Sequence, residues 1–121
     1  MDMNYGFLGA GYNSVATVRS PLAQQAFGEP RMLFMVVEHF KNNDALPVYR
    51  RFRDRGRLAP EGVQYISSWV DDKLERCFQI MEAGERDLLD RWIENWSDIV
   101  DFEVFPVLSS NEATERVAPR L

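Results

Sequence analysis

The chain has 121 residues, of which 45% are hydrophobic and 27% are charged, and its formal net charge is −5. This length favours one domain, and the composition excludes the collagen-like, fully disordered and membrane-spanning classes. Residues 1–31 and 111–121 each carry two basic and two acidic side chains, so the whole negative charge lies between them. Because an acidic domain is repelled by phosphate backbones and anionic lipid, we expect no nucleic-acid partner and no membrane partner.

Residues 1–31 differ from the rest of the chain because they combine glycine and proline with no sustained apolar periodicity. No strand pattern precedes Gly9-Ala10-Gly11, so this is not a phosphate-binding loop. The acidic start and the interrupted apolar runs do not fit a secretory signal. We predict a flexible arm or an overcalled start, with the native start at Met32. The alternative is an arm that folds onto a partner subunit.

Residues 32–108 have the periodic pattern of one compact domain. Met32–Phe40 is apolar on both alternating faces, which is typical of a buried strand. The capping residues Asn42–Asp44 follow, and the next apolar side chains recur three and four apart, which predicts a helix. Gly56 is a suitable end for that helix.

The second half of the domain adds two strands, a helix and a final strand. Val63–Val70 and Cys77–Ala83 predict two strands joined by a turn. Glu85–Trp96 is the clearest helix, with one stripe of leucine, isoleucine and tryptophan. Asp98–Leu108 predicts the last strand, and residues 109–121 predict a polar C-terminal tail that frays.

This order predicts an α+β fold of ferredoxin-like βαββαβ type, with two helices on one face of a four-stranded antiparallel sheet. The first strand is apolar on both sides, with Phe34 and Val36 on one and Leu33, Met35 and Val37 on the other. The helices can hide only one side, and a domain this small has little core of its own. We therefore expect a homodimer joined through the open sheet faces, which is a dimeric α+β barrel.

The same stretch resembles a bacterial family described as a domain of unknown function, DUF3303. The resemblance covers about residues 32–108 and rests on MLFMVV at 32–37, PEGV at 60–63, Trp69, and WSDIVDFEVFPV at 96–107. It implies membership of the dimeric α+β barrel group, which includes muconolactone isomerases and small quinone-forming monooxygenases. It therefore supports the fold and the dimer without supplying an activity. Residues 1–31 have no counterpart in the family pattern.

His39 is the only histidine and Cys77 the only cysteine, so no internal disulfide can form and the chain fits a cytoplasmic protein. If the first and third strands are antiparallel neighbours, His39 and Cys77 are expected to lie close together. They are then a candidate base and nucleophile. The alternative is a strand-end histidine beside a buried structural thiol. Two such ligands are too few for zinc, so we expect no metal and no cofactor.

Three glutamates, Glu38, Glu82 and Glu103, occupy strand positions where apolar residues are expected. A carboxyl group that faces an apolar cavity has a raised pKa and can transfer protons. Of the candidates, His39 and Glu82 are predicted to be catalytic. The alternative is a set of strand-end groups that reach solvent or an arginine.

The candidate ligand-binding residues are arginines of the first helix and aromatic side chains. A guanidinium cluster suits a carboxylate or a phosphate, and Arg51 and Arg55 are the candidates, with Arg55 nearest to the apolar stripe. The alternative is a solvated helix face balanced by acidic neighbours. Tyr49, Trp69 and Trp96 are the candidates for lining a pocket, although aromatic stripes at helical spacing are usually core.

Two functions of different classes fit these features. One is a small-molecule binder or cofactor-free enzyme of the dimeric barrel group, which predicts an enclosed pocket with a polar group. The other is a non-catalytic homodimerisation or partner-binding module, which predicts a filled interior and an exposed patch. RNA binding is not expected, because the third strand lacks the glycine of the RNA-binding strand pattern.

Overall fold

The computed structural model describes residues 31–121, and these form one compact unit. The flexible arm or overcalled start predicted for residues 1–31 lies outside the described residues, apart from Arg31. The elements are β1 (Met32–Phe40), the short 3-10 helix η1 (Lys41–Asn43), α2 (Leu46–Arg55), β2 (Val63–Val70), β3 (Arg76–Ala83), α3 (Arg86–Glu94), β4 (Val100–Val107), α4 (Ser110–Val117) and the 3-10 turn η2 (Ala118–Arg120).

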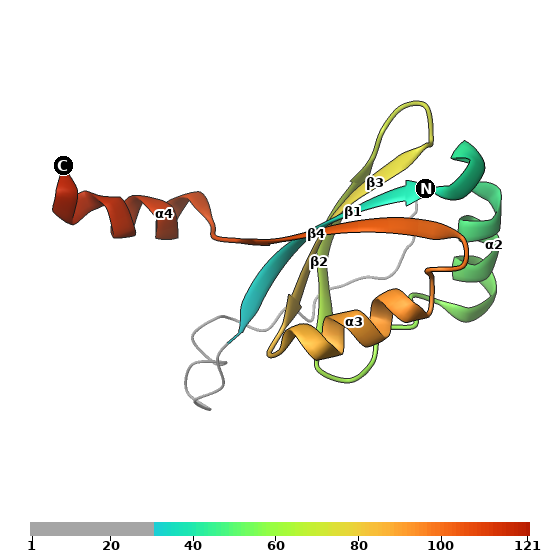
Figure 1. Ribbon diagram of the computed structural model, residues 1–121, viewed down its shortest axis with the longest axis horizontal. Helices are drawn as coiled ribbons and strands as arrows, with labels where there is room; N and C mark the ends of the chain where they lie inside the picture. The colour runs from blue at the N-terminus through green and yellow to red at the C-terminus, as the bar shows by residue number, and fades with distance from the viewer. Residues whose placement is uncertain (1–30) are drawn as a thin grey trace. The chain divides into compact units, whose positions relative to one another are not determined.

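The four strands form one antiparallel sheet in the order β2-β3-β1-β4. Figure 1 shows α2 and α3 on the same side of this sheet. The predicted ferredoxin-like α+β fold is therefore confirmed. Most predicted bounds agree to within two residues, and β1 and β2 have the predicted bounds.

Strand alternation sends every second side chain of β1 into the layer between the sheet and the helices. Phe34, Val36, Glu38 and Phe40 are buried, whereas the residues between them keep part of their surface exposed. β3 behaves in the same way and buries Cys77, Gln79, Met81 and Ala83. The largest fully buried side chains of this layer are Trp92, Phe34, Met81, Leu89, Val36 and Val100.

Side chains of α3 and of the segment directly after it donate hydrogen bonds to the backbone of the connection from α2 to β2. These bonds hold the connection against α3. The indole nitrogens of Trp92 and Trp96 both donate to the carbonyl oxygen of Arg57, at 3.1 and 2.9 Å. The amide nitrogen of Asn95 donates to the carbonyl oxygen of Leu58 at 2.9 Å. Leu58 has φ 62°, a conformation that is unfavourable for a residue with a side chain. These bonds fix the backbone of Arg57 and direct its side chain along the sheet.

The C-terminal tail, which the sequence predicts to be polar and frayed, is helical in the structure. Residues 110–117 form α4, and Ser109 and Glu112 close its first turn as a reciprocal capping box. The Ser–x–x–Glu spacing is a recognised helix start that satisfies two of the free N–H groups. Figure 1 shows that α4 continues outward from the end of β4.

Among the described residues, no helix is both long enough and apolar enough to cross a membrane.

Candidate functional site

A cluster of polar side chains is embedded on the helix side of the sheet. Glu38 on β1 and Gln79 on β3 are the two buried polar residues of the core, with exposed fractions of 7% and 2%. The amide nitrogen of Gln79 donates to Oε2 of Glu38 at 2.6 Å. The amide oxygen of Gln79 accepts a hydrogen bond from the guanidinium of Arg57. The three side chains therefore form a continuous chain across the two central strands.

Burial dominates the ionisation of Glu38. It raises the pKa of this carboxyl from 4.5 to about 7, although the positive charge of Arg57 and the hydrogen bond from Gln79 both lower it. Removal of a carboxylate from water costs more than these two partners return. The pKa of this carboxyl therefore lies close to neutral pH, which is the condition for efficient proton transfer.

Cys77 is the cross-strand neighbour of Glu38 and lies in the same layer. Burial raises the pKa of the Cys77 thiol well above its ordinary value, and the adjacent Glu38 raises it further, while Arg57 lowers it. A thiol in this state is protonated at neutral pH, and only the thiolate is a strong nucleophile. Cys77 therefore acts as a small apolar core residue.

The outer end of the polar cluster lies between aromatic rings. The guanidinium of Arg57 is 3.8 Å from the ring centre of Tyr65 and 5.2 Å from that of Phe52. Tyr65 is partly exposed, and its hydroxyl group lies 2.9 Å from Oγ of Ser68. The cluster thus runs from the buried carboxyl of Glu38, through Gln79 and Arg57, to an aromatic side chain at the surface.

The predicted pairing of His39 with Cys77 is wrong. In the register of β1 and β3, Cys77 lies opposite Glu38, and His39 lies opposite Arg76. Successive side chains point to opposite faces of a sheet, so His39 lies on the face without α2 and α3, while Cys77 lies beneath them. The strands are neighbours as expected, but a displacement of one residue places the two side chains on different faces.

The structure does not bring the predicted catalytic residues His39 and Glu82 together. Both lie on the face opposite to α2 and α3, but Glu82 is paired with Leu33, six residues from His39 along β1. This separation corresponds to about 20 Å of strand. Nε2 of His39 lies 3.6 Å from a carboxylate oxygen of Glu103, and Glu82 lies 3.6 Å from Nε of Arg31.

Two of the predicted ligand-binding residues, Arg51 and Trp96, do meet. Arg51 makes a two-pronged ion pair with Asp98 at 2.8 and 2.7 Å, and its guanidinium lies 5.5 Å from the centre of the Trp96 ring. The hydrogen bond from Arg51 lowers the pKa of Asp98 to about 2. This contact ties α2 to the segment after α3.

The other three candidates lie apart from one another. Tyr49 stands edge-on to Phe40, with ring centres 6.4 Å apart, and Arg55 is exposed on the last turn of α2. Trp69 is 63% exposed on β2 and lies opposite Phe78 of β3, on the face without α2 and α3. The five candidates therefore do not form one site.

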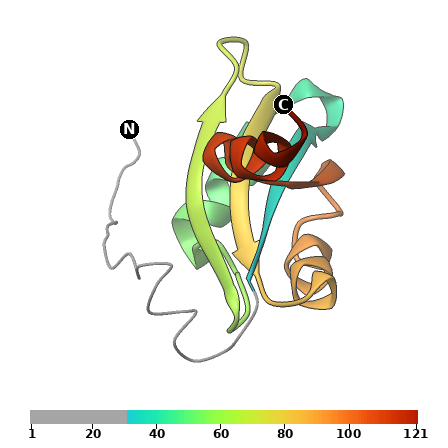
Figure 2. The same ribbon diagram turned by 90° about the vertical axis from the view of Figure 1, so that its left-hand side faces the viewer.

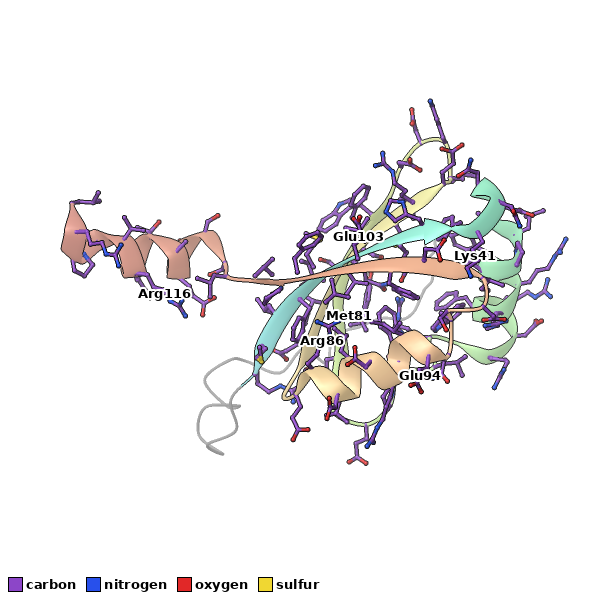
Figure 3. The ribbon with its side chains drawn as sticks, viewed as in Figure 1. Lys41, Met81, Arg86, Glu94, Glu103 and Arg116 are labelled. Carbon is purple, nitrogen blue, oxygen red and sulfur yellow. The ribbon has the colours of Figure 1, made fainter. Side chains whose placement is uncertain are left out.

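The second notable surface is the open face, the side of the sheet that neither α2 nor α3 covers. Its apolar side chains are only partly buried or exposed, in contrast to their neighbours on the helix side. They come from all four strands: Leu33, Met35, Val37, Trp69, Phe78, Ile80, Phe105 and Val107. In Figure 3 the labelled Glu103 lies on this side of the sheet, and Met81 lies on the helix side.

Polar groups border one end of the open face. His39, Asp101 and Glu103 lie beside one another on β1 and β4. On β3, the guanidinium of Arg76 lies 5.4 Å from the ring centre of Phe78. An apolar centre with a polar edge is the usual anatomy of a protein interface.

Sequence reasoning missed Gln79, and it selected Arg51 and Arg55 rather than Arg57, and Glu82 rather than Glu38. The pattern contained the necessary signal, because Glu38 has the same strand parity as Phe34 and Val36, which were expected to face one side together. Gln79 likewise has the same strand parity as Cys77 and Met81, the apolar residues of β3 on its two sides. The importance of Arg57 follows from hydrogen bonds made by α3, which the sequence does not reveal.

Within residues 31–121, no cluster of three or more histidine, cysteine, aspartate or glutamate side chains is placed to hold a metal ion. No curated protein and no solved structure matches the chain. A family model described as "Domain of unknown function (DUF3303)" matches residues 32–121. The match extends to Leu121 and so includes α4, beyond the resemblance over residues 32–108. The chain belongs to the family of the domain of unknown function DUF3303.

Proposed function

We propose that this protein is a homodimerisation module whose two copies join through the open face, giving a dimeric α+β barrel. The observation that carries the proposal is the row of apolar side chains across all four strands on the side without α2 and α3. Trp69 is 63% exposed and Phe105 is 49% exposed. Large apolar side chains that are contiguous and exposed mark interaction surfaces on otherwise polar proteins.

A second copy is the partner that best fits this face. The surface is apolar at its centre and extends over all four strands, so the same patch on two copies can pair under a two-fold axis. A stable dimer buries about 800 Å² on each partner, which is a natural size for one face of a four-stranded sheet. The polar residues His39, Arg76 and Glu103 then lie at one end of the apolar centre on each copy.

The interior agrees better with this module than with a pocket enzyme built from the predicted residues. The layer between the sheet and the helices is filled by Trp92, Phe34, Met81 and their neighbours. The side chains expected to line a pocket, such as Trp69 and Glu82, belong to the opposite face. We place the dimer in the bacterial cytoplasm, where a buried lone thiol such as Cys77 needs no disulfide partner.

Light scattering coupled to size-exclusion chromatography tests the proposal on the full chain. Trp69→Asp and Phe105→Asp each add a charge to the open face, so both are expected to shift the protein from dimer to monomer. Leu46→Asp is the matched control, because Leu46 is 57% exposed on α2, away from that face. The control should remain a dimer. A wild-type monomer, or variants that dimerise as the wild type does, would overturn the proposal.

A second candidate function is proton transfer to a small organic molecule at Glu38. The observation that favours it is the buried carboxyl with a pKa of about 7, linked through Gln79 to Arg57. A guanidinium over the Tyr65 ring suits a planar molecule with a carboxylate or a phenolate. In this function Arg57 holds the ligand, and Glu38 takes or gives the proton.

Thermal unfolding with benzoate and with phenol tests this second candidate. A ligand that binds only the folded state raises the melting temperature as its concentration rises. We expect such a rise for the wild type and its loss in Arg57→Gln. Arg53→Gln is the control, because Arg53 is exposed and pairs with Asp54. The absence of any rise with either probe would count against the proton-transfer site and leave the dimer proposal in place.

A further inference from the structure

Helix α4 exposes all of its side chains. Every residue from Leu108 to Leu121 is exposed, including Val117 and Leu121, which are 47% and 96% exposed. Its N-terminus is nevertheless closed by the capping box of Ser109 and Glu112. A helix of eight residues is marginal in water by itself, because isolated helices need roughly 12–15 residues to be populated. Its formation therefore calls for a packing surface.

The helix has one apolar side suited to such packing. Ala113 and Val117 are four residues apart and share a face of α4, and Leu121 follows four residues later, directly after η2. We call these three residues the α4 stripe. Polar and charged side chains such as Glu112 and Glu115 occupy the other side, and this division is typical of a helix that packs against one surface.

The α4 stripe follows directly from the open face. Only Leu108 and Ser109 separate β4 from α4, and the last open-face side chains of β4 are Phe105 and Val107. Figure 2 shows α2 behind the sheet and α4 in front of it, on the open-face side. A molecule that covers the open face therefore meets α4. In Figure 3 the labelled Arg116 lies out on α4, away from the sheet of its own chain.

We propose that α4 of each protomer packs through its stripe on the partner protomer, against apolar side chains of the partner's open face. The inference rests on the proposed homodimer and adds a reciprocal exchange of C-terminal helices to it. A two-fold axis makes the exchange closed, because each copy supplies one α4 and receives one. The described chain leaves both the α4 stripe and the open face uncovered. In the exchange, the α4 stripe of one copy and part of the open face of the other cover each other.

Charge substitutions in the α4 stripe test whether the stripe contributes to the affinity of the dimer. In the full chain, the double variant Val117→Asp/Leu121→Asp is expected to weaken dimerisation at least tenfold in sedimentation equilibrium. Asn111→Asp is the matched control, since it adds a charge to the opposite side of α4 and should leave the dissociation constant unchanged. If the double variant dimerises as tightly as the wild type, the exchange is wrong while the homodimer stands. If the wild type is monomeric, both proposals fail.

A mixed-dimer experiment tests the location of α4. A nitroxide is attached to Arg116→Cys in unlabelled protein, which is then mixed with ¹⁵N-labelled wild type. Cys77 is buried and does not compete for the label. We expect the indole N–H signal of Trp69 to broaden more than the signals of Trp92 and Trp96, which lie on the helix side. Equal broadening of all three signals, or none in a confirmed dimer, would overturn the exchange. A nitroxide at Leu46→Cys serves as the control.

Discussion

Glu38 is the residue at which burial and charge oppose each other most strongly. It lies between Phe34, Val36 and Phe40 on the buried side of β1, and only Gln79 and Arg57 compensate its charge. A carboxyl in this position is retained at a cost to stability, which replacement by a neutral isostere would remove. Its environment therefore predicts a measurable dependence of stability on pH.

We predict that unfolding free energy falls between pH 4.5 and about 7, and that Glu38→Gln removes this dependence. The unfolded chain loses the Glu38 proton near its ordinary pKa of 4.5, whereas the folded chain keeps it until about 7. The contribution to stability is thus complete below pH 4.5 and is lost as the pH rises through 7, at about 3 kcal/mol in total. Urea unfolding at several pH values and one protein concentration measures it.

The control for this prediction is Glu94→Gln, because Glu94 is an exposed residue at the end of α3. The control should retain the pH dependence of the wild type. If Glu38→Gln showed the same fall in stability as the wild type, the dependence would have to arise at another group.

At the scale of single elements, the strands and helices of the domain could be predicted because apolar periodicity determines them locally. β1 and β2 have the predicted bounds, and α3 differs by one or two residues at each end. Apolar periodicity alone does not determine which side chains of neighbouring strands share a face. This sharing depends on the register between β1 and β3, and a displacement of one residue separates His39 from Cys77.

The C-terminal tail and the connection after α2 differ in whether a local sequence signal predicts their structure. The Ser109–Glu112 capping box is a local signal for α4, and it was available in the sequence. The position of Arg57 has no local signal, because it depends on indole hydrogen bonds from Trp92 of α3 and from Trp96 just after α3. Sequence reasoning therefore selected Arg55, the neighbour that the structure leaves exposed.

We predict that Gly62→Ala and Gly56→Ala each destabilise the fold by about 2 kcal/mol, for different reasons. Gly62 has φ 95°, which costs a residue with a Cβ atom about 1 kcal/mol, whereas Gly56 combines φ 74° with ψ −162°, a conformation that only glycine adopts readily. A Cβ atom at Gly62 would also lie 2.9 Å from Cδ1 of Leu88, whereas one at Gly56 meets open space. This crowding adds a cost of similar size.

Urea unfolding of the two glycine variants measures both losses. A loss in Gly62→Ala of only about 1 kcal/mol would show that α3 yields to the added methyl group.

At the scale of the whole molecule, the sheet has two apolar faces and the described chain covers one. Helices α2 and α3 lie over Phe34, Val36 and Met81, while Trp69 and Phe105 remain in contact with water. The need for a second cover was predictable from the alternating pattern of β1. The proposed role of α4 in this cover was not predictable in this way, because it depends on the direction in which the chain leaves β4 (Figure 1).

We predict that the melting temperature rises with protein concentration, because the proposed dimerisation through the open face would stabilise the folded state by mass action. Scanning calorimetry over a hundredfold range of concentration measures this. In Trp69→Asp the melting temperature should lose its dependence on concentration, since the variant is expected to be a monomer. A wild-type melting temperature that stays constant over this range would argue against a dimer coupled to folding.

Sedimentation equilibrium of the full chain tests most directly the proposal that a second copy covers the open face. One copy has a mass of 14.1 kDa, so the protein should sediment at twice this mass at micromolar concentrations. Trp69→Asp should return it to the mass of a single copy, with an unchanged circular dichroism spectrum. A wild-type mass of 14.1 kDa at every concentration would show that the apolar face remains in water, and the proposed barrel would be wrong.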